Sequence, residues 1–115
     1  FSPDGQWLFT GGYGAPSVAD EPSLYVWDAE TGTRCAGTIN ALNWPWRIEF
    51  SPDGSKALIM SLSIYTALYD LNVHEERYRV RVQDARQAMF LDGGARFALG
   101  TIHGFTVHAV VDGRQ

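Results

Sequence analysis

A five-residue phrase, Phe-Ser-Pro-Asp-Gly, occurs twice in this chain, at residues 1–5 and again at residues 50–54. A weaker copy, Phe-Leu-Asp-Gly-Gly, occupies residues 90–94. An apolar run that ends in an aspartate follows each copy, and these aspartates recur at intervals of 42 residues as Asp28, Asp70 and Asp112. A repeat built from short apolar runs and turn residues is typical of stacked β-sheet units. The sequence therefore predicts an all-β architecture.

Each copy of the phrase contains residues that favour a tight turn. Proline presets φ, aspartate accepts hydrogen bonds from nearby backbone amides, and glycine tolerates a left-handed conformation. The third copy lacks the proline but keeps aspartate and glycine, so we expect it to bend as well. The predicted turn residues, with the strand-ending aspartates included, are Pro3, Asp4, Gly5, Asp28, Pro52, Asp53, Gly54, Asp70, Asp92, Gly93 and Asp112.

Apolar and β-branched runs between these turns predict strands along the whole chain. In residues 77–82 three arginines alternate with Tyr78, Val80 and Val82, which indicates one buried and one exposed face. A row of charge also discourages pairing with another chain, so we expect this strand at the edge of a sheet. The expected strands are 7–11, 24–28, 33–39, 46–50, 56–61, 64–71, 77–82, 86–90, 96–101 and 105–111.

Composition argues against several functions. The net charge is −4 and Lys56 is the only lysine, so we expect no surface for nucleic acid or for an anionic membrane. No apolar stretch approaches the ~18 residues that span a bilayer. Cys35 is the only cysteine, which excludes an internal disulfide and any multi-cysteine zinc site. We expect no cofactor and no metal, and we predict a cytoplasmic location.

The order of these motifs resembles the WD-repeat β-propeller family. The resemblance rests on residues 1–5, 8–12, 25–28 and 31–32 in the first unit, and on residues 50–54 and 68–70 in the second. It implies four-stranded antiparallel blades around a channel, with the repeated phrase joining the innermost strand to the second. The Gly-His pair that usually precedes the inner strand is absent, and Tyr69 and Val111 stand where the first unit has Trp27. The family's buried network of His, Ser/Thr, Asp and Trp is therefore not expected in its usual form.

In the frame of this family the chain is one propeller fragment. It contains a partial blade at residues 1–39, a full blade at about 45–82 and a partial blade at 86–115. Closed propellers have about four to eight blades, so we expect an incomplete ring. We also expect the chain to be a segment of a longer one, whose remaining blades are its partners, in preference to self-assembly by exchange of chain ends.

The loop at residues 12–23 is the longest departure from the repeat, by five to seven residues. The family's topology places it on the same propeller face as residues 40–46. Aromatic and charged side chains on loops of a rigid scaffold are suited to binding a protein. The expected partner-binding residues are Tyr13, Asp20, Glu21, Trp44, Trp46, Arg86 and His103. The alternative for Trp44 and Trp46 is that they fill the groove between blades.

The chemistry of catalysis is not visible in this sequence. Each Asp-Gly turn offers one carboxylate, whereas Ca²⁺ requires six or more oxygens. The strand-ending aspartates fall on separate units and cannot act as one acid–base pair. The sequence contains no nucleophile elbow and no phosphate-binding glycine loop. We predict a non-catalytic scaffold for protein–protein interaction rather than an enzyme. The alternative is the propeller portion of a larger hydrolase or kinase whose catalytic residues lie outside this segment.

Overall fold

The computed structural model describes residues 1–11, 22–35, 39–40, 45–61 and 65–115. Within these residues the chain forms ten strands, one short 3₁₀ helix, η1 (Asp92–Gly94), and no α-helix. The strands are β1 (Trp7–Gly11), β2 (Pro22–Asp28), β3 (Ile39–Asn40), β4 (Pro45–Phe50), β5 (Lys56–Ser61), β6 (Tyr65–Asp70), β7 (Glu75–Arg81), β8 (Gln87–Leu91), β9 (Arg96–Thr101) and β10 (Gly104–Ala109). The prediction of an all-β chain is confirmed.

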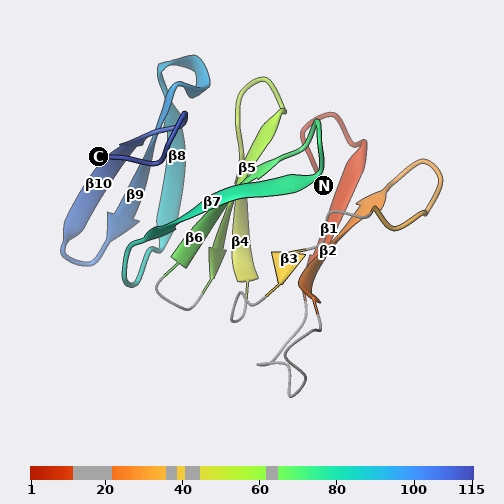
Figure 1. The fold of residues 1–115 in the computed structure, drawn as a ribbon, viewed down its shortest axis with the longest axis horizontal. Coiled ribbons are helices and arrows are strands. Elements are labelled where there is room, and N and C mark those ends of the chain that lie inside the picture. The colour runs from red at the N-terminus through yellow and green to blue at the C-terminus, as the bar shows by residue number, and fades with distance from the viewer. Residues whose placement is uncertain (12–21, 36–38, 41–44, 62–64) are drawn as a thin grey trace.

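The strands form three antiparallel sheets that stand side by side (Figure 1). The first sheet has the order β1-β2-β3, the second β4-β5-β6-β7 and the third β10-β9-β8. Strands that are neighbours in a sheet are also consecutive in the chain, as in the blades of a propeller. The described sheets do not close into a barrel. The structure thus confirms the predicted fold class, which is antiparallel propeller blades in an incomplete ring, with four strands in the middle sheet.

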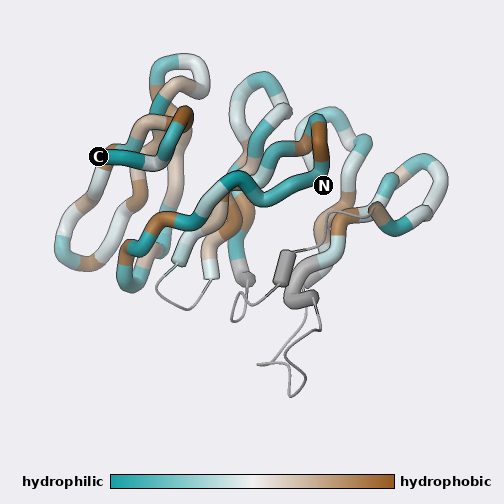
Figure 2. The backbone as a smooth tube through the Cα atoms, in the orientation of Figure 1, coloured by the Kyte–Doolittle hydropathy of each residue, from teal (hydrophilic) through white to brown (hydrophobic). Residues whose placement is uncertain are grey.

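The arginine-rich strand β7 lies at the edge of the second sheet, as predicted. Val80 is buried in the core, while Arg77 and Arg81 are exposed. Arg79 is half-buried, and its guanidinium pairs with Glu76 at 2.8 Å. Figure 2 shows the same contrast, with hydrophilic colour along much of β7 and in the turns, and hydrophobic colour on strands inside the sheets.

Two strands differ from the sequence prediction. The strand expected at 33–39 is present only as β3 and as an isolated bridge between Trp27 and Arg34, and residues 36–38 lie outside the described residues. The strand expected at 105–111 ends at Ala109, because the chain turns there. The Ala109 carbonyl accepts a hydrogen bond from the Gly113 amide at 2.8 Å, and Gly113 has a φ of +75°, which requires no side chain.

The strand pairing identifies equivalent positions in the three sheets. In each sheet the corresponding ladder begins at one pair: Trp7 with Asp28, Lys56 with Asp70, and Arg96 with Ala109. Beyond each pair the next amide donates to a carbonyl across the ladder at 2.8 to 2.9 Å: Ala29 to Gln6, Leu71 to Ser55, and Val110 to Ala95. Because this bond recurs in all three sheets, we use the alignment throughout and call it the structural register.

The structural register corrects the expected role of Asp112. The interval of 42 residues pairs Asp112 with Asp28 and Asp70 as a strand-ending aspartate. In the third sheet, however, the strand-ending position is occupied by Ala109, and Asp112 lies in the turn that follows. Sequence spacing counts residues and takes no account of which backbone groups pair.

The first and second sheets are held together by a hydrophobic interface, which we call the first interface. The first sheet contributes Val26, which is fully buried, together with Trp7 and Phe9. The Phe9 ring lies 5.6 Å from Phe50 and 5.7 Å from Tyr69 in edge-to-face geometry, which adds to simple burial. Buried residues of the second sheet on this side are Ala57, Ile59, Ala67, Tyr69 and Leu71.

The second interface joins the opposite face of the second sheet to the third sheet. Leu58 and Leu68, each at most 1% exposed, lie on the side of the second sheet, and Phe97 and Leu99 lie on the side of the third. Tyr78 of β7 adds a polar contact, because its hydroxyl donates to the Val110 carbonyl at 2.7 Å. Alternate residues of one strand therefore serve two different interfaces, which explains why β5 is apolar along its length.

Candidate functional site

The two ends of the sheets differ in character. One end carries the turns built on the repeated phrase and the turns that follow the strand-ending positions, and we call it the corner end. The other end, which we call the loop end, carries the connections that leave β1, β3, β5, β7 and β9 (Figure 1). The expected partner-binding residues belong to the loop end, so each end is described in turn.

The first Phe-Ser-Pro-Asp-Gly turn closes on itself through its polar side chains. Asp4 Oδ1 accepts hydrogen bonds from the Ser2 hydroxyl at 2.6 Å and from the Gln6 amide at 3.0 Å. The Trp7 amide donates to Ser2 Oγ at 3.0 Å. The hydroxyl and the amide stabilise the ionised carboxylate and lower the pKa of Asp4. Gly5 completes the turn with a φ of +72°.

The second copy repeats this network atom by atom. Asp53 Oδ1 accepts from the Ser55 amide at 3.0 Å and from the Ser51 hydroxyl at 2.7 Å, and the Lys56 amide donates to Ser51 Oγ at 3.0 Å. The Ser55 amide and the two serine hydroxyls lower the pKa of Asp53 from 3.8 to about 2. Pro3 and Pro52 occupy the same turn position in the two copies. The polar groups of both turns are thus directed at their own backbone.

The third copy adopts a different turn. Without the proline, residues 92–94 form η1, in which Asp92 and Gly93 have φ values of +53° and +66°. Asp92 forms an ion pair with Arg96 instead of accepting a turn amide from a serine-capped corner. The bend is retained, but its hydrogen bonding is not.

The three aspartates of the 42-residue spacing also bond to nearby amides. Asp28 Oδ1 accepts from the Glu30 amide at 2.9 Å, and Asp112 Oδ1 accepts from the Arg114 amide at 3.0 Å. Asp70 Oδ1 accepts from the Asn72 amide at 2.9 Å. These carboxylates lie in separate turns and do not converge on one site, so the geometry offers no acid–base pair.

Asp70 differs from the other two because it is buried and pairs with two cations. Its Oδ2 lies 3.2 Å from Arg77 Nη2 and 3.6 Å from Lys56 Nζ. Burial opposes ionisation of Asp70, but the Asn72 amide and the two cations outweigh it, and the pKa is lowered. This ion pair ties β5, β6 and β7 together at the corner end.

At the loop end, four of the expected partner-binding residues, Tyr13, Asp20, Glu21 and Trp44, lie outside the described residues. Trp46 belongs to β4, and only its backbone is described. Their positions relative to one another therefore stay a prediction from the sequence.

Arg86 and His103, the other two expected residues, are exposed at the loop end of the third sheet. The Arg86 amide donates to the Gly100 carbonyl at 2.9 Å, which holds Arg86 beside the end of β9. His103 lies in the turn that joins β9 to β10, where its amide donates to Thr101 Oγ1 at 3.1 Å. The structure thus brings these two residues to the same end of one sheet.

Ile102, which the sequence reasoning did not single out, lies between Thr101 and His103 and is 72% exposed. An aliphatic residue at the tip of a turn that is otherwise polar or small is the signal that could have identified it. Ile102, His103 and Arg86 together form an exposed group with one apolar and two basic or titratable side chains. We call this group the loop-end patch.

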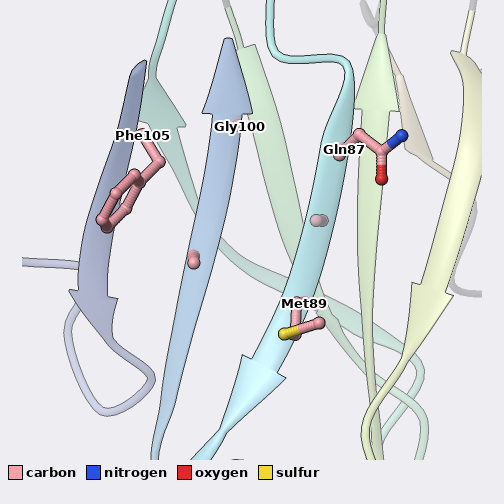
Figure 3. Close-up of a pocket in the computed structure, with 6 residues that line it drawn as sticks. Gln87, Met89, Gly100 and Phe105 are labelled. Atoms are coloured by element: carbon pink, nitrogen blue, oxygen red, sulfur yellow. The ribbon is translucent and has the colours of Figure 1, made fainter.

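The third sheet also has a shallow cavity of about 190 Å³ (Figure 3). Its lining consists of Gln87, Ala88, Met89, Ala98, Gly100 and Phe105. None of these side chains titrates, so the cavity contains no acid, base or nucleophile. Among the described residues no group of three His, Cys, Asp or Glu side chains is placed to hold a metal ion. No helix in the described part of the chain is long and apolar enough to cross a membrane.

The hydrogen bond of a WD-type tryptophan is present in the first sheet alone among the three described sheets. Trp27 Nε1 donates to Thr10 Oγ1 at 2.8 Å. In the structural register the position of Trp27 is taken by Tyr69 in the second sheet and by His108 in the third. The sequence spacing had assigned it to Val111, which is 88% exposed in a turn. That assignment was wrong, because β10 ends before Val111.

His108 is buried and fully hydrogen-bonded in this position. Its Nδ1 lies 2.8 Å from the Gly113 carbonyl, which requires a proton on Nδ1, and its Nε2 lies 2.8 Å from Thr106 Oγ1. The imidazole stacks on Phe97 with ring centres 5.0 Å apart. His108 therefore acts as a core residue that closes the turn after β10.

No protein-family model matches the sequence, and no curated protein matches it. Two solved structures have a similar fold. Hydrazine synthase of Kuenenia stuttgartiensis matches 98% of this chain with a TM-score of 0.71 and 19% identity, over 32% of its own chain. A eukaryotic initiation factor matches 100% of this chain with a TM-score of 0.67 and 17% identity, over 31% of its own chain. The chain thus spans about a third of each, and the likeness is one of fold.

Proposed function

We propose that this chain belongs to a cytoplasmic, WD-repeat-like β-propeller that acts as a non-catalytic scaffold and binds a protein through the loop end of its sheets. The observation that carries the proposal is the loop-end patch, in which Ile102 is exposed beside His103 and Arg86. The hydrogen bond from Trp27 to Thr10 supports the WD-like assignment. The single cysteine, Cys35, is compatible with a reducing compartment.

The contrast between the two ends supports contact at the loop end. At the corner end, the carboxylates of Asp4, Asp53 and Asp70 are engaged by their own turns or by neighbouring cations. A partner at this end would have to compete with these bonds. At the loop end, covering the Ile102 side chain is worth about 2 kcal/mol, since that is typical for burial of an aliphatic side chain. Arginine beside an apolar contact is also common where binding energy concentrates.

The test is binding of a purified partner by two matched variants. The partner is first captured from an extract of the source cells with the unmodified protein and identified by mass spectrometry. Ile102→Asp should then weaken the measured affinity about tenfold or more, the loss of about 1.4 kcal/mol expected at a well-packed contact. Because Ile102 is exposed, its replacement should leave the melting temperature unchanged.

Val111→Asp is the matched control, because Val111 is equally apolar and 88% exposed but lies at the corner end. It should leave the affinity unchanged. Equal affinity for Ile102→Asp and the unmodified protein would contradict binding at the loop-end patch. Equal loss in both variants would show that the effect is one of added charge and not of position.

A further inference from the structure

The third sheet has one face in the second interface and one face that nothing in the described chain covers. On the uncovered face Phe105 is 74% exposed and Met89 is 61% exposed (Figure 3). Ala98 and Gly100 lie between them and form the floor of the cavity of about 190 Å³. We call the surface made by Met89, Ala98, Gly100, Phe105 and Val107 the free face. Among these residues none carries a charge.

The structural register shows that the free face continues a series of interfaces. In each sheet one cross-strand pair lies on the side that faces the next sheet: Phe9 with Val26, Leu58 with Leu68, and Ala98 with Val107. The first pair packs into the first interface and the second pair into the second interface. The third pair occupies the same position and has no sheet against it. A further β-sheet is therefore the kind of surface that fits there.

The free face is smaller at its centre than its two counterparts. Ala98 takes the place of Leu58, and Gly100 takes the place of Met60, which is fully buried in the second sheet. This loss of side-chain volume is what opens the cavity. A sheet that covers the free face must supply larger side chains at these points, because an unfilled void of this size loses the contacts that hold an interior together.

The first sheet presents a surface with such larger side chains on its own outward face. The relevant positions are those that, in the second sheet, receive the preceding sheet through Ala57, Ile59, Ala67 and Tyr69. In the first sheet the same positions are occupied by Leu8, Thr10, Tyr25 and Trp27. Three of the four are larger, and the rings of Tyr25 and Trp27 lie 6.2 Å apart. The surplus volume of this face matches the deficit of the free face.

We propose that a second copy of this chain packs the outward face of its first sheet against the free face of the third sheet. The contact is head to tail, so each copy uses two different surfaces, and association continues until a ring closes or a filament forms. Exchange of strands is not required, because whole sheet faces meet. Arg34 does not oppose the contact, since its guanidinium lies 5.0 Å from the centre of the Tyr25 ring and finds no cation on the free face.

The first test measures the mass of the 115-residue chain by light scattering and by sedimentation across a wide range of concentration. We expect the mean mass to rise with concentration. Phe105→Asp should weaken the association by at least about tenfold, because it places a charge in the centre of an apolar contact. Gly100→Leu should do the same by filling the cavity.

Gly100→Leu is informative because the single chain can accept it. A Cβ at Gly100 would lie 3.6 Å from Gln87 Cβ, which is an ordinary contact. Val111→Asp is the control, since it adds the same charge to an exposed apolar residue at the corner end. Circular dichroism and the melting temperature show that each variant is folded. A chain that stays monomeric at all concentrations overturns the proposal, as does association that neither variant weakens.

The second test establishes the head-to-tail arrangement. Phe105→Asp disables the free face, and Tyr25→Asp disables the outward face of the first sheet. Each variant alone should be monomeric, whereas an equimolar mixture should form dimers that do not grow, because one intact surface of each kind remains. A mixture that stays monomeric would show that the free face pairs with itself or with another surface, and the proposed arrangement would then be wrong.

Discussion

Replacement of Asp53 by asparagine tests how much the repeated turn contributes to stability. Asp53 Oδ1 accepts three hydrogen bonds, from the Ser51 hydroxyl, the Ser55 amide and the Ser55 hydroxyl, at 2.7, 3.0 and 2.8 Å. These bonds close the turn between β4 and β5, the inner hairpin of the second sheet. An asparagine side chain would keep the shape but lose the charge that strengthens each bond.

The pKa gives the magnitude and the pH window. The pKa of Asp53 is lowered from 3.8 to about 2, first by the Ser55 amide and then by the two hydroxyls. A shift of this size corresponds to at most about 2.5 kcal/mol, and solvent screening at this exposed turn reduces it to about 1 kcal/mol. Because the folded pKa is the lower one, this stability is present above about pH 4. It is lost as the pH falls from about 4 towards 2.

The assay is urea unfolding followed by tryptophan fluorescence at a series of pH values. Asp53→Asn should be less stable than the unmodified chain by about 1 kcal/mol at neutral pH, and the two stability curves should converge near about pH 2. Glu30→Gln, which removes an exposed acid from another turn, is the control and should shift neither curve. A difference between Asp53→Asn and the unmodified chain that is independent of pH would refute the reasoning.

Three further predictions concern packing between the sheets. Gly113→Ala should destabilise the chain more than Gly32→Ala: both glycines have a positive φ, but only at position 113 would a Cβ lie 2.6 Å from the Tyr78 ring, so the two melting temperatures isolate the clash. Tyr78→Phe should cost about 1 kcal/mol in chemical denaturation, because it removes the hydroxyl that donates to a backbone carbonyl of the third sheet. Leu58→Ala should cost about 2–5 kcal/mol, since Leu58 is fully buried, whereas Met89→Ala should change the unfolding free energy of the single chain little.

The turns and most strands could be predicted from the sequence because their causes are local. Proline, aspartate and glycine at residues 52–54 favour a turn wherever they occur in this order. The alternation of arginine with apolar residues in β7 depends only on the period of two in a strand. The same reasoning located β1, β5 and β9 at their observed bounds.

The third unit shows where local reasoning stopped. The aspartate spacing pointed to Val111 and Asp112, yet the backbone pairs three residues earlier and places His108 in the core. A histidine with both ring nitrogens bonded and its face on Phe97 satisfies that position as well as a tryptophan does. Nothing in the spacing of aspartates reports such a shift, since it arises from pairing across the ladder.

The exposed surfaces show the same division. Ile102, Phe105 and Met89 read in the sequence as ordinary strand or turn residues, and Ala98 and Gly100 as small ones. Their meaning depends on which face of which sheet they occupy and on what the neighbouring sheet covers. The sequence alone determined the all-β units, their turns and the edge character of β7, because these follow from backbone preference and side-chain alternation. Only the tertiary structure decided the register of the third sheet, the two interfaces and the free face, because packing is set by contacts between residues far apart in the chain.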